Sequence, residues 1–323
     1  MKYTSLGRTG IKVSELCFGT MSFGGRADKK ESEHMYRTCR EAGINFFDCA
    51  NVYQKGTAES FLGSFIAQER DKVVVTTKVY GAMGDDVNDK GLGAKHVRLA
   101  LEESLKRLGT DYVDVLFLHH FDASTSEEEV LRTVDRLVRD GKVLSIGVSN
   151  FAAYQVERML WLSRIKQLAP IACIQPMYNI AKRMAEVELL PMAETEGLGV
   201  ITYSPLGGGL LSGRYKDGYT QASGRLVEDA KYHKRYEGTF YEQVAHEYSA
   251  LCAKRGFTEA SLAVAWVMAN KQVTAPIIGA ANTAHLKQSL DAISLNLDEE
   301  ILQEIDEISP PPPPANDRNE ERL

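Results

Sequence analysis

Eight short apolar runs alternate with longer amphipathic segments along this chain, and that rhythm restricts the fold more than any other feature. The runs are apolar throughout rather than at every second residue, which is typical of parallel strands covered by helices. They occupy residues 15–19, 44–48, 72–78, 112–119, 143–149, 171–175, 199–204 and 275–279. Eight such units predict an α/β fold, a single-domain (β/α)8 TIM barrel.

The segments between the runs have the spacing of amphipathic helices. Residues 94–109 place apolar side chains on one helical face, and Gly109 follows where a C-terminal cap belongs. Residues 125–141 repeat this design, with Ser126 as the N-cap, acidic residues in the first turn and Gly141 at the end. Both segments therefore predict helices that pack on the outside of the barrel.

The two ends of the chain add to the barrel. Residues 3–13 have the glycines and alternation of a β-hairpin. After the last strand come a helix at 283–293 and an extra C-terminal helix at 298–308. The proline run and charged residues of 310–323 predict an extended or disordered tail. We therefore expect one domain over residues 1–309, followed by the tail.

The main competing fold is an open doubly wound sheet with a Rossmann nucleotide site. Such a sheet usually has fewer strands and a GxGxxG motif after the first of them. The first predicted strand ends in "FGTMSFGG", which does not match. The cluster "GGGLLSG" has Ser212 where the third glycine belongs, and it follows the seventh strand. We therefore reject the Rossmann interpretation.

Composition narrows the possible functions. The 323-residue chain has a formal net charge of −6 and no long basic stretch, so we expect no nucleic-acid partner. No apolar run is long enough to predict a membrane span, and the start lacks the apolar core of a signal peptide. The five cysteines form no CxxC pair, which favours a reducing cytoplasm and predicts no metal site.

Polar side chains stand where the predicted strands end. Asp48 ends the second run, with Tyr53 just beyond it, while Lys78 ends the third and His119 the fourth. In a barrel, the carboxyl ends of all strands face one shared cavity, so these four groups should converge.

The four groups suit proton transfer. A tyrosine has an ordinary pKa near about 10, and a nearby ammonium makes its hydroxyl a better acid. Lys78 can supply that ammonium, Asp48 can keep it charged, and His119 can orient a substrate oxygen or relay a proton. Such a set could protonate a carbonyl oxygen as hydride reaches its carbon, but a cofactor must supply the hydride.

Motifs over nearly the whole chain resemble the aldo-keto reductase superfamily. They are "YTSLGRTGIKVSELCFGTMSFGG", "FFDCANVY", "TTK", "LHHFD", "GVSNF", "QPMYN" and "YSPLGGGLLSG", in family order. The resemblance implies a catalytic tetrad of Asp48, Tyr53, Lys78 and His119, with Tyr53 as the general acid. In "LHHFD" the first histidine aligns with the family residue, which favours His119 over His120.

The resemblance also implies a nicotinamide cofactor bound without a Rossmann fold. Ser149, Asn150 and Gln175 would bind the carboxamide, and Tyr203 would stack on the ring. The remaining predicted cofactor contacts, which run from the pyrophosphate channel to the adenosine, are Ser204, Leu206, Gly207, Leu210, Gly279, His285, Gln288 and Ser289. The predicted substrate contacts are Met21, Tyr80 and His120.

The resemblance weakens at the adenosine end. Related sequences often carry arginine at the positions of Ala281 and His285, and a neutral imidazole binds a 2′-phosphate poorly. Lys287 stands nearby in the sequence. NADP is the cofactor that the family implies, with NAD or the use of both left open.

The sequence thus predicts an NAD(P)H-dependent oxidoreductase that interconverts a small aldehyde or ketone, such as a sugar or another polar carbonyl, and its alcohol. An alternative is a cofactor-binding redox sensor that resembles potassium-channel β-subunits, which would keep the same tetrad. A non-redox barrel, such as an isomerase, would not need the predicted carboxamide contacts. The sequence predicts neither a particular carbonyl nor an oligomeric state.

Overall fold

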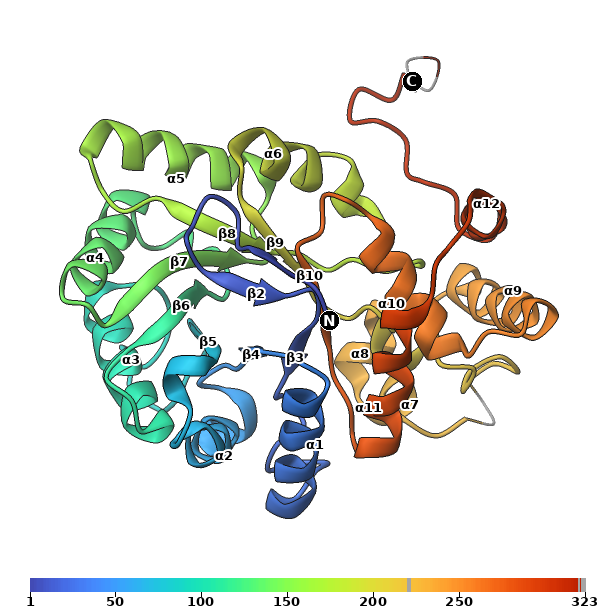
Figure 1. Cartoon of the computed structure of the whole chain (residues 1–323). Coiled ribbons are helices and arrows are strands. Elements are labelled where there is room, and N and C mark those ends of the chain that lie inside the picture. The colour runs from blue at the N-terminus through green and yellow to red at the C-terminus, as the bar shows by residue number, and fades with distance from the viewer. Residues whose placement is uncertain (220–221, 319, 321–323) are drawn as a thin grey trace.

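The predicted barrel is present in the structure, a computed structural model that describes residues 1–219, 222–318 and 320 (Figure 1). Eight parallel strands close in the order β10-β3-β4-β5-β6-β7-β8-β9, so that β10 pairs with both β9 and β3. They are β3 (Cys17–Gly19), β4 (Phe46–Asp48), β5 (Val74–Val79), β6 (Val113–Leu118), β7 (Val143–Ser149), β8 (Ile171–Gln175), β9 (Gly199–Thr202) and β10 (Ala275–Ile278).

Helices surround the barrel and follow its strands along the chain. They are α1 (Lys29–Glu41), α2 (Thr57–Ile66), α3 (Ala94–Leu108), α4 (Glu127–Arg139), α5 (Ala153–Lys166), α6 (Leu189–Glu196), α7 (Arg225–Glu228), α8 (Ala230–Arg235), α9 (Thr239–Arg255), α10 (Glu259–Ala269), α11 (Thr283–Leu290) and α12 (Glu299–Ile308). The predicted caps are confirmed: Gly109 is left-handed after α3, and Ser126 accepts a hydrogen bond from the backbone of Glu129 at the start of α4.

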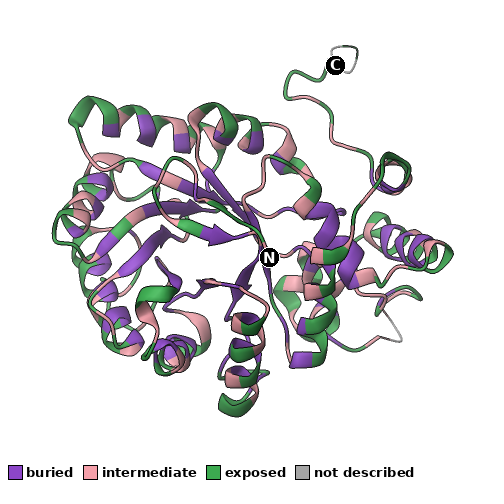
Figure 2. Ribbon diagram, viewed as in Figure 1, coloured by how far each residue is buried: buried purple, intermediate pink, exposed green. Residues whose placement is uncertain are grey.

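The apolar core has two layers, because strand side chains alternate between the inside of the barrel and the surrounding helices. In Figure 2 the barrel strands are coloured mostly as buried. The inner layer includes Phe46, Val115 and Ile201. The outer layer joins the other face of each strand to the apolar stripes of the helices. Burial on both faces explains why the strand sequences are apolar throughout.

The N-terminal hairpin closes one end of the barrel. Its strands, β1 (Tyr3–Ser5) and β2 (Lys12–Ser14), pair antiparallel, and Leu6 and Val13 join the inner apolar layer. At Gly7, which has φ +56°, a β-carbon would lie 2.4 Å from the backbone nitrogen of Gly199. The hairpin therefore packs directly against the amino-terminal end of the barrel, crossing its middle in Figure 1. The opposite end, where the strands terminate, remains for the site.

The structure differs from the predictions in its strand lengths and in one long connection, and it describes part of the tail. Several strands are shorter than expected, and β9 ends at Thr202, so that Tyr203 lies just beyond it. The β9–α9 connection, residues 203–238, contains α7 and α8, which the sequence did not predict, because both are very short. Residues 310–318 form no helix or strand and run outward from α12 (Figure 1). Most of the remaining tail lies outside the described residues.

No helix within the described residues is long and apolar enough to cross a membrane.

Candidate active site

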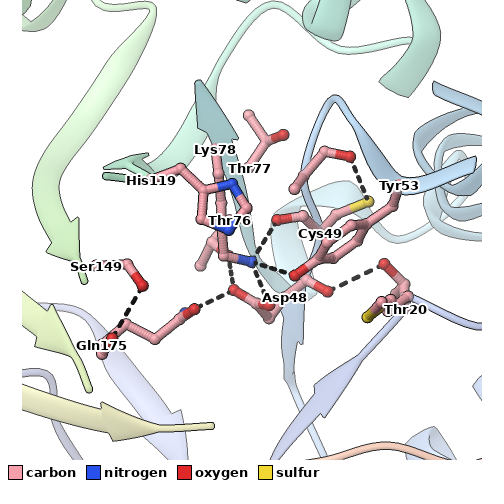
Figure 3. Close-up of polar contacts among 12 residues, drawn as sticks. Thr20, Asp48, Cys49, Tyr53, Thr76, Thr77, Lys78, His119, Ser149 and Gln175 are labelled. Carbon is pink, nitrogen blue, oxygen red and sulfur yellow. Dashed lines mark hydrogen bonds and ion pairs between the residues drawn. The ribbon is translucent and has the colours of Figure 1, made fainter. Parts of the chain in front are cut away.

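A buried ion pair lies at the carboxyl ends of β4 and β5. Lys78 Nζ lies 2.5 Å from Asp48 Oδ2 and donates a second hydrogen bond to Cys49 O at 2.8 Å (Figure 3). The Lys78 side chain is fully buried. Burial by itself favours the neutral amine, but the charge and hydrogen bonds of Asp48 and Tyr53 outweigh it and raise the pKa of Lys78 above its ordinary value. Lys78 is therefore a cation at neutral pH.

The Asp48 carboxylate is held from several sides. Its Oδ1 atom accepts hydrogen bonds from Thr76 Oγ1 at 2.8 Å and from Gln175 Nε2 at 2.9 Å. The backbone oxygen of Asp48 accepts two more from Thr20, at 2.9 Å from the amide and 3.0 Å from the hydroxyl. These bonds span strands β4, β5 and β8, so the carboxylate is fixed across the barrel mouth.

Tyr53 brings its hydroxyl to the same ammonium. Lys78 Nζ donates to this hydroxyl at 3.2 Å, as Figure 3 shows. Burial raises the pKa of Tyr53 to about 12, while the charge of Lys78 acts in the opposite direction. Lys78 lowers the pKa of Tyr53, as predicted, but the rise caused by burial is larger. The phenol is therefore protonated throughout the physiological pH range.

His119 stands beside the phenol as a neutral ring. The two ring centroids lie 6.4 Å apart, edge to face. Burial, with the nearby charge of Lys78, lowers the pKa of His119 to about 3. His119 also stacks on His120, with ring centroids 5.2 Å apart. A neutral imidazole can orient an oxygen by donating a hydrogen bond from its N–H group. It is too weak an acid to release that proton at neutral pH.

A second polar group adjoins the ion pair on β7 and β8. Ser149 Oγ donates to Gln175 O at 2.9 Å, because the two residues are register partners. Asn150, which has a left-handed backbone with φ 59°, donates to His119 O at 2.9 Å. Its side-chain oxygen accepts a hydrogen bond from the Tyr203 hydroxyl at 2.8 Å. The four predicted carboxamide and ring contacts are thus brought together.

A left-handed turn follows Tyr203. Ser204 has φ 59°, and Gly207 has φ 58°, a conformation that favours glycine. Leu210 is buried beneath this turn, while Leu206 is partly exposed. Gly207 is itself buried and packs near the Tyr236 ring, so the predicted close approach of a phosphate group to this turn stays a prediction.

The sequence model of the "Aldo/keto reductase family" matches residues 15–310 of this chain. The chain belongs to the aldo/keto reductase family. One relative, an uncharacterized oxidoreductase YrpG of Bacillus subtilis, is 38% identical over 97% of both chains. A probable voltage-gated potassium channel subunit beta of Arabidopsis thaliana is 36% identical over 91% of this chain and 92% of its own. Norsolorinic acid reductase A of Aspergillus parasiticus is 35% identical over 93% of this chain and 79% of its own.

The segment predicted to contact the adenosine, which includes His285, is influenced by a positive charge that the sequence did not indicate. His285 is exposed on α11, and partial burial together with the positive charge of Arg214 lowers its pKa. Arg214 comes from the β9–α9 connection, far away in the sequence. The positive charge of Arg214 therefore acts on the His285 imidazole, although the two residues are far apart in the sequence. The signal that could have indicated it is the position of Arg214 directly after the glycine cluster that ends at Gly213.

Two more arginines of this connection approach the mouth. The guanidinium carbons of Arg225 and Arg235 lie 4.8 and 4.7 Å from the centre of the Tyr232 ring. Among the described residues, most arginines pair with a carboxylate. Those without such a partner are Arg8, Arg136, Arg214, Arg225 and Arg235. Three of these five belong to one connection, which therefore concentrates uncompensated positive charge.

Three of the predicted cofactor contacts differ in their exposure to solvent. Gln288 is exposed on α11, where it can meet a ligand, and Gly279 is exposed just after β10. Ser289, by contrast, is only 1% exposed, and its hydroxyl has no hydrogen-bond partner within the described part of the chain. A direct contact between Ser289 and an adenine would require the local structure to open.

The predicted substrate contacts border the mouth on two sides. Tyr80 and His120 lie together, with ring centroids 5.2 Å apart, and they continue the stack that begins at His119. Met21 is 39% exposed, and its sulfur lies 3.8 Å from the Tyr232 hydroxyl. Within the described residues, no group of three or more His, Cys, Asp or Glu side chains could hold a metal ion.

A cavity of about 240 Å³ adjoins the carboxamide set. It shares Asn150, Gln175 and Tyr203 with that set, and Met177 and Met184 are among its apolar lining residues. Much of its remaining apolar lining, such as Val148 and Ile174, belongs to the outer layer of the core, so the cavity lies between the strands and helices α5 and α6 rather than over the buried ion pair.

Proposed function

We propose that this protein is an NADP(H)-dependent reductase that converts a small aldehyde or ketone to its alcohol, with Tyr53 as the general acid. The observation that carries the proposal is the position of Lys78 Nζ, bound to Asp48 at 2.5 Å and to the Tyr53 hydroxyl at 3.2 Å. This chain of three groups opens at the barrel mouth, beside the set that suits a nicotinamide carboxamide.

The phenol and the ammonium act as a unit. Tyr53 donates its proton to the substrate oxygen as negative charge develops there, and the resulting phenolate is stabilised by Lys78. Without that ammonium, burial would raise the pKa of the phenol further and make it a poorer donor. Asp48 keeps Lys78 protonated and in place. The phenolate then regains a proton from solvent.

His119 directs the substrate oxygen. Because its imidazole is neutral, it can hydrogen-bond the carbonyl without competing with Tyr53 as the acid. Its ring lies edge to face with the phenol, so an oxygen that reaches both groups is confined to the space between them. The reacting carbonyl is thereby oriented before the proton moves.

The residues present fit a nicotinamide dinucleotide. The bound cofactor would supply the hydride. Ser149, Asn150 and Gln175 would hold its carboxamide, and Tyr203 would pack against its ring. The arginines of the β9–α9 connection favour an anionic partner, because they have no carboxylate partner among the described residues, and the cofactor carries phosphate groups.

The 2′-phosphate of NADP is the partner that suits Arg214. The sequence leaves NADP, NAD or the use of both open, since His285 stands where related sequences often carry arginine. Because Arg214 is exposed, has no carboxylate partner among the described residues and acts on His285 through its charge, we propose that the protein prefers NADP. A guanidinium binds a phosphate through two parallel hydrogen bonds, which a neutral imidazole cannot provide.

A coupled screen tests this function. Purified protein is mixed with NADPH or NADH and with panels of aldehydes, ketones and sugars, and absorbance of the reduced cofactor is followed. The reverse reaction is run with alcohols and the oxidised cofactors. We expect turnover of at least one carbonyl class with NADPH, lost in the Tyr53→Phe variant. Wild-type protein that binds NADPH but turns over no carbonyl in either direction contradicts the proposal.

A second candidate function is a cofactor-bound sensing subunit. It is supported by the similarity to the probable potassium channel subunit beta of Arabidopsis thaliana. Such a protein could keep the same tetrad and yet release its cofactor very slowly. Stopped-flow measurement of NADPH release separates the two functions, since a metabolic reductase must exchange its cofactor at least as fast as it turns over.

A further inference from the structure

The turn that carries Tyr53 is conformationally unfavourable. Gln54 and Lys55 have φ values of 48° and 53°, and Gly56 follows with φ 91°. Two consecutive non-glycine residues in the left-handed region are uncommon, because their β-carbons crowd the backbone. The turn has its own backbone hydrogen bonds, from Lys55 to Val52 O at 3.2 Å and from Thr57 to the carbonyls of Tyr53 and Gln54, but these do not relieve the crowding of the β-carbons. The turn must therefore be held by its surroundings.

One side of the turn rests on Arg107 of α3. A β-carbon at Gly56 would lie 2.6 Å from Arg107 Cδ and 2.7 Å from its Nε, so the arginine side chain packs directly on the glycine backbone. Gly56 is buried, and α2 begins at the next residue. The position of Arg107 thus limits where the turn can lie.

Arg107 is itself held by a fully buried carboxylate. Arg107 Nε donates to Glu59 Oε2 at 2.7 Å, and the Glu59 side chain is 0% exposed. The other carboxylate oxygen of Glu59 accepts a hydrogen bond from Thr77 Oγ1 at 2.5 Å. Thr77 precedes Lys78 on β5 and faces the helices, whereas Lys78 faces the barrel interior. One carboxylate therefore connects the Tyr53 turn to the strand that carries the ammonium.

We propose that Glu59 and Arg107 are positioning residues that keep the Tyr53 hydroxyl within hydrogen-bond distance of Lys78. They contact neither ammonium nor phenol. Glu59 fixes β5 through Thr77, and Arg107 fixes the turn through Gly56. The buried Glu59–Arg107 ion pair therefore fixes the position of Tyr53 relative to Lys78. This inference rests on the proposed function for its kinetic consequence, but its structural consequence can be measured without any substrate.

The test uses 3-fluorotyrosine placed at position 53 and read by fluorine NMR. The main variant is Glu59→Gln combined with Arg107→Met, which removes both charges and leaves no buried ion without a partner. We expect the fluorine resonance to move or broaden relative to that of the wild type. Thr77→Val, which removes one hydrogen bond and preserves shape, is a milder second variant that should move the resonance in the same direction.

Arg70→Leu provides a matched control. Arg70 forms a comparable part-buried ion pair with Asp114, 2.8 Å apart, but it lies just before β5 at the amino-terminal end of the barrel. We expect this variant to lower the melting temperature while leaving the fluorine spectrum at position 53 unchanged. A purely structural role for Glu59 and Arg107 predicts the same behaviour for the main variant.

Kinetics add a second readout. We expect kcat of the main variant to fall about tenfold to a hundredfold, since misplacing a reacting group by about 1 Å has effects of this size. The Kd for NADPH should change less than about twofold. A folded main variant with the wild-type fluorine spectrum and at least half of wild-type kcat overturns the inference. A shifted spectrum in a protein whose wild type reduces no carbonyl supports the positioning and contradicts the proposed function instead.

Discussion

The two sides of the barrel mouth differ in how their charges are satisfied. On the β4–β5 side, Lys78 has three hydrogen-bond partners from within the chain, and both carboxylate oxygens of Asp48 are occupied. In the β9–α9 connection, Arg214, Arg225 and Arg235 have no carboxylate partner among the described residues. On the first side, the charged groups are paired within the protein. On the second side, the arginines can pair with an anionic ligand.

Burial explains this difference. A fully buried ammonium must find its partners within the protein, because an unpaired charge away from water is very costly. A partly exposed guanidinium can stay hydrated until an anion replaces the water. The β4–β5 side should therefore determine the rate of proton transfer, and the β9–α9 connection should determine which cofactor binds.

The largest effect is expected from Tyr53→Phe. Loss of a positioned general acid should lower kcat by about 10²–10⁴-fold, because no other group on this side of the mouth can donate the proton. Binding of NADPH, followed by fluorescence titration, should change less than about twofold, since the cofactor contacts lie elsewhere. A variant that keeps half of wild-type kcat on its best carbonyl would remove Tyr53 from its assigned role.

Arg214→Ala tests the other side. The Kd for NADPH should rise about tenfold to a hundredfold, because a charge-assisted hydrogen bond to phosphate contributes roughly 1.5–3 kcal/mol. The Kd for NADH should hardly change. Arg136→Ala, which removes an exposed arginine of α4 without a carboxylate partner, is the control and should affect neither cofactor. Equal losses for NADPH and NADH would show that Arg214 does not recognise the 2′-phosphate.

His285→Arg refines the same comparison. If the imidazole lies beside the 2′-phosphate, a second guanidinium there should tighten NADPH specifically. If Arg214 already satisfies that phosphate, the gain should be small, and wild-type protein should already prefer NADPH strongly. Titrating both cofactors against wild type, His285→Arg and Arg214→Ala distinguishes these cases.

The low pKa of His119 predicts a pH effect on stability. Burial lowers it to about 3, against about 6.5 in an unfolded chain, so between these values the unfolded state binds more protons. The contribution of His119 to stability is therefore complete above about pH 6.5 and is lost as the pH falls toward 3. Urea unfolding of wild type and His119→Gln at pH 7 and pH 4.5 should show a smaller acid loss in the variant. His34→Gln, at an exposed site on α1, is the control.

The smallest effect is expected from the tail, which belongs to neither side. Ending the chain after Ser309 should shift the melting temperature by no more than a degree or two, because residues 310–318 form no helix or strand. Ser309→Ala should cost more, since its buried hydroxyl donates to Ile180 O at 2.6 Å. A large loss of stability or activity on truncation would mean that the tail contributes to the folded domain.

The barrel was predictable because its signals are local. Each strand is an apolar run, each helix has its own periodicity and cap, and the polar groups at the strand ends follow in register. The rule that parallel strands end at a common face is then enough to predict that Asp48, Tyr53 and Lys78 converge. The short helices α7 and α8 were missed, since one or two turns carry too little periodicity to recognise.

The sequence alone thus determined the eight strands, their order and the four converging groups, because strand and helix patterns repeat within a few residues. Only the tertiary structure decided how those groups behave. The pKa of Tyr53 depends on how deeply it is buried, and the pKa of His285 depends in part on the charge of Arg214, which is distant in the sequence. Likewise, Glu59 reaches Thr77 and Arg107 only when α2 packs against β5 and α3. Such contacts join distant parts of the chain, and burial and charge act through distances in space.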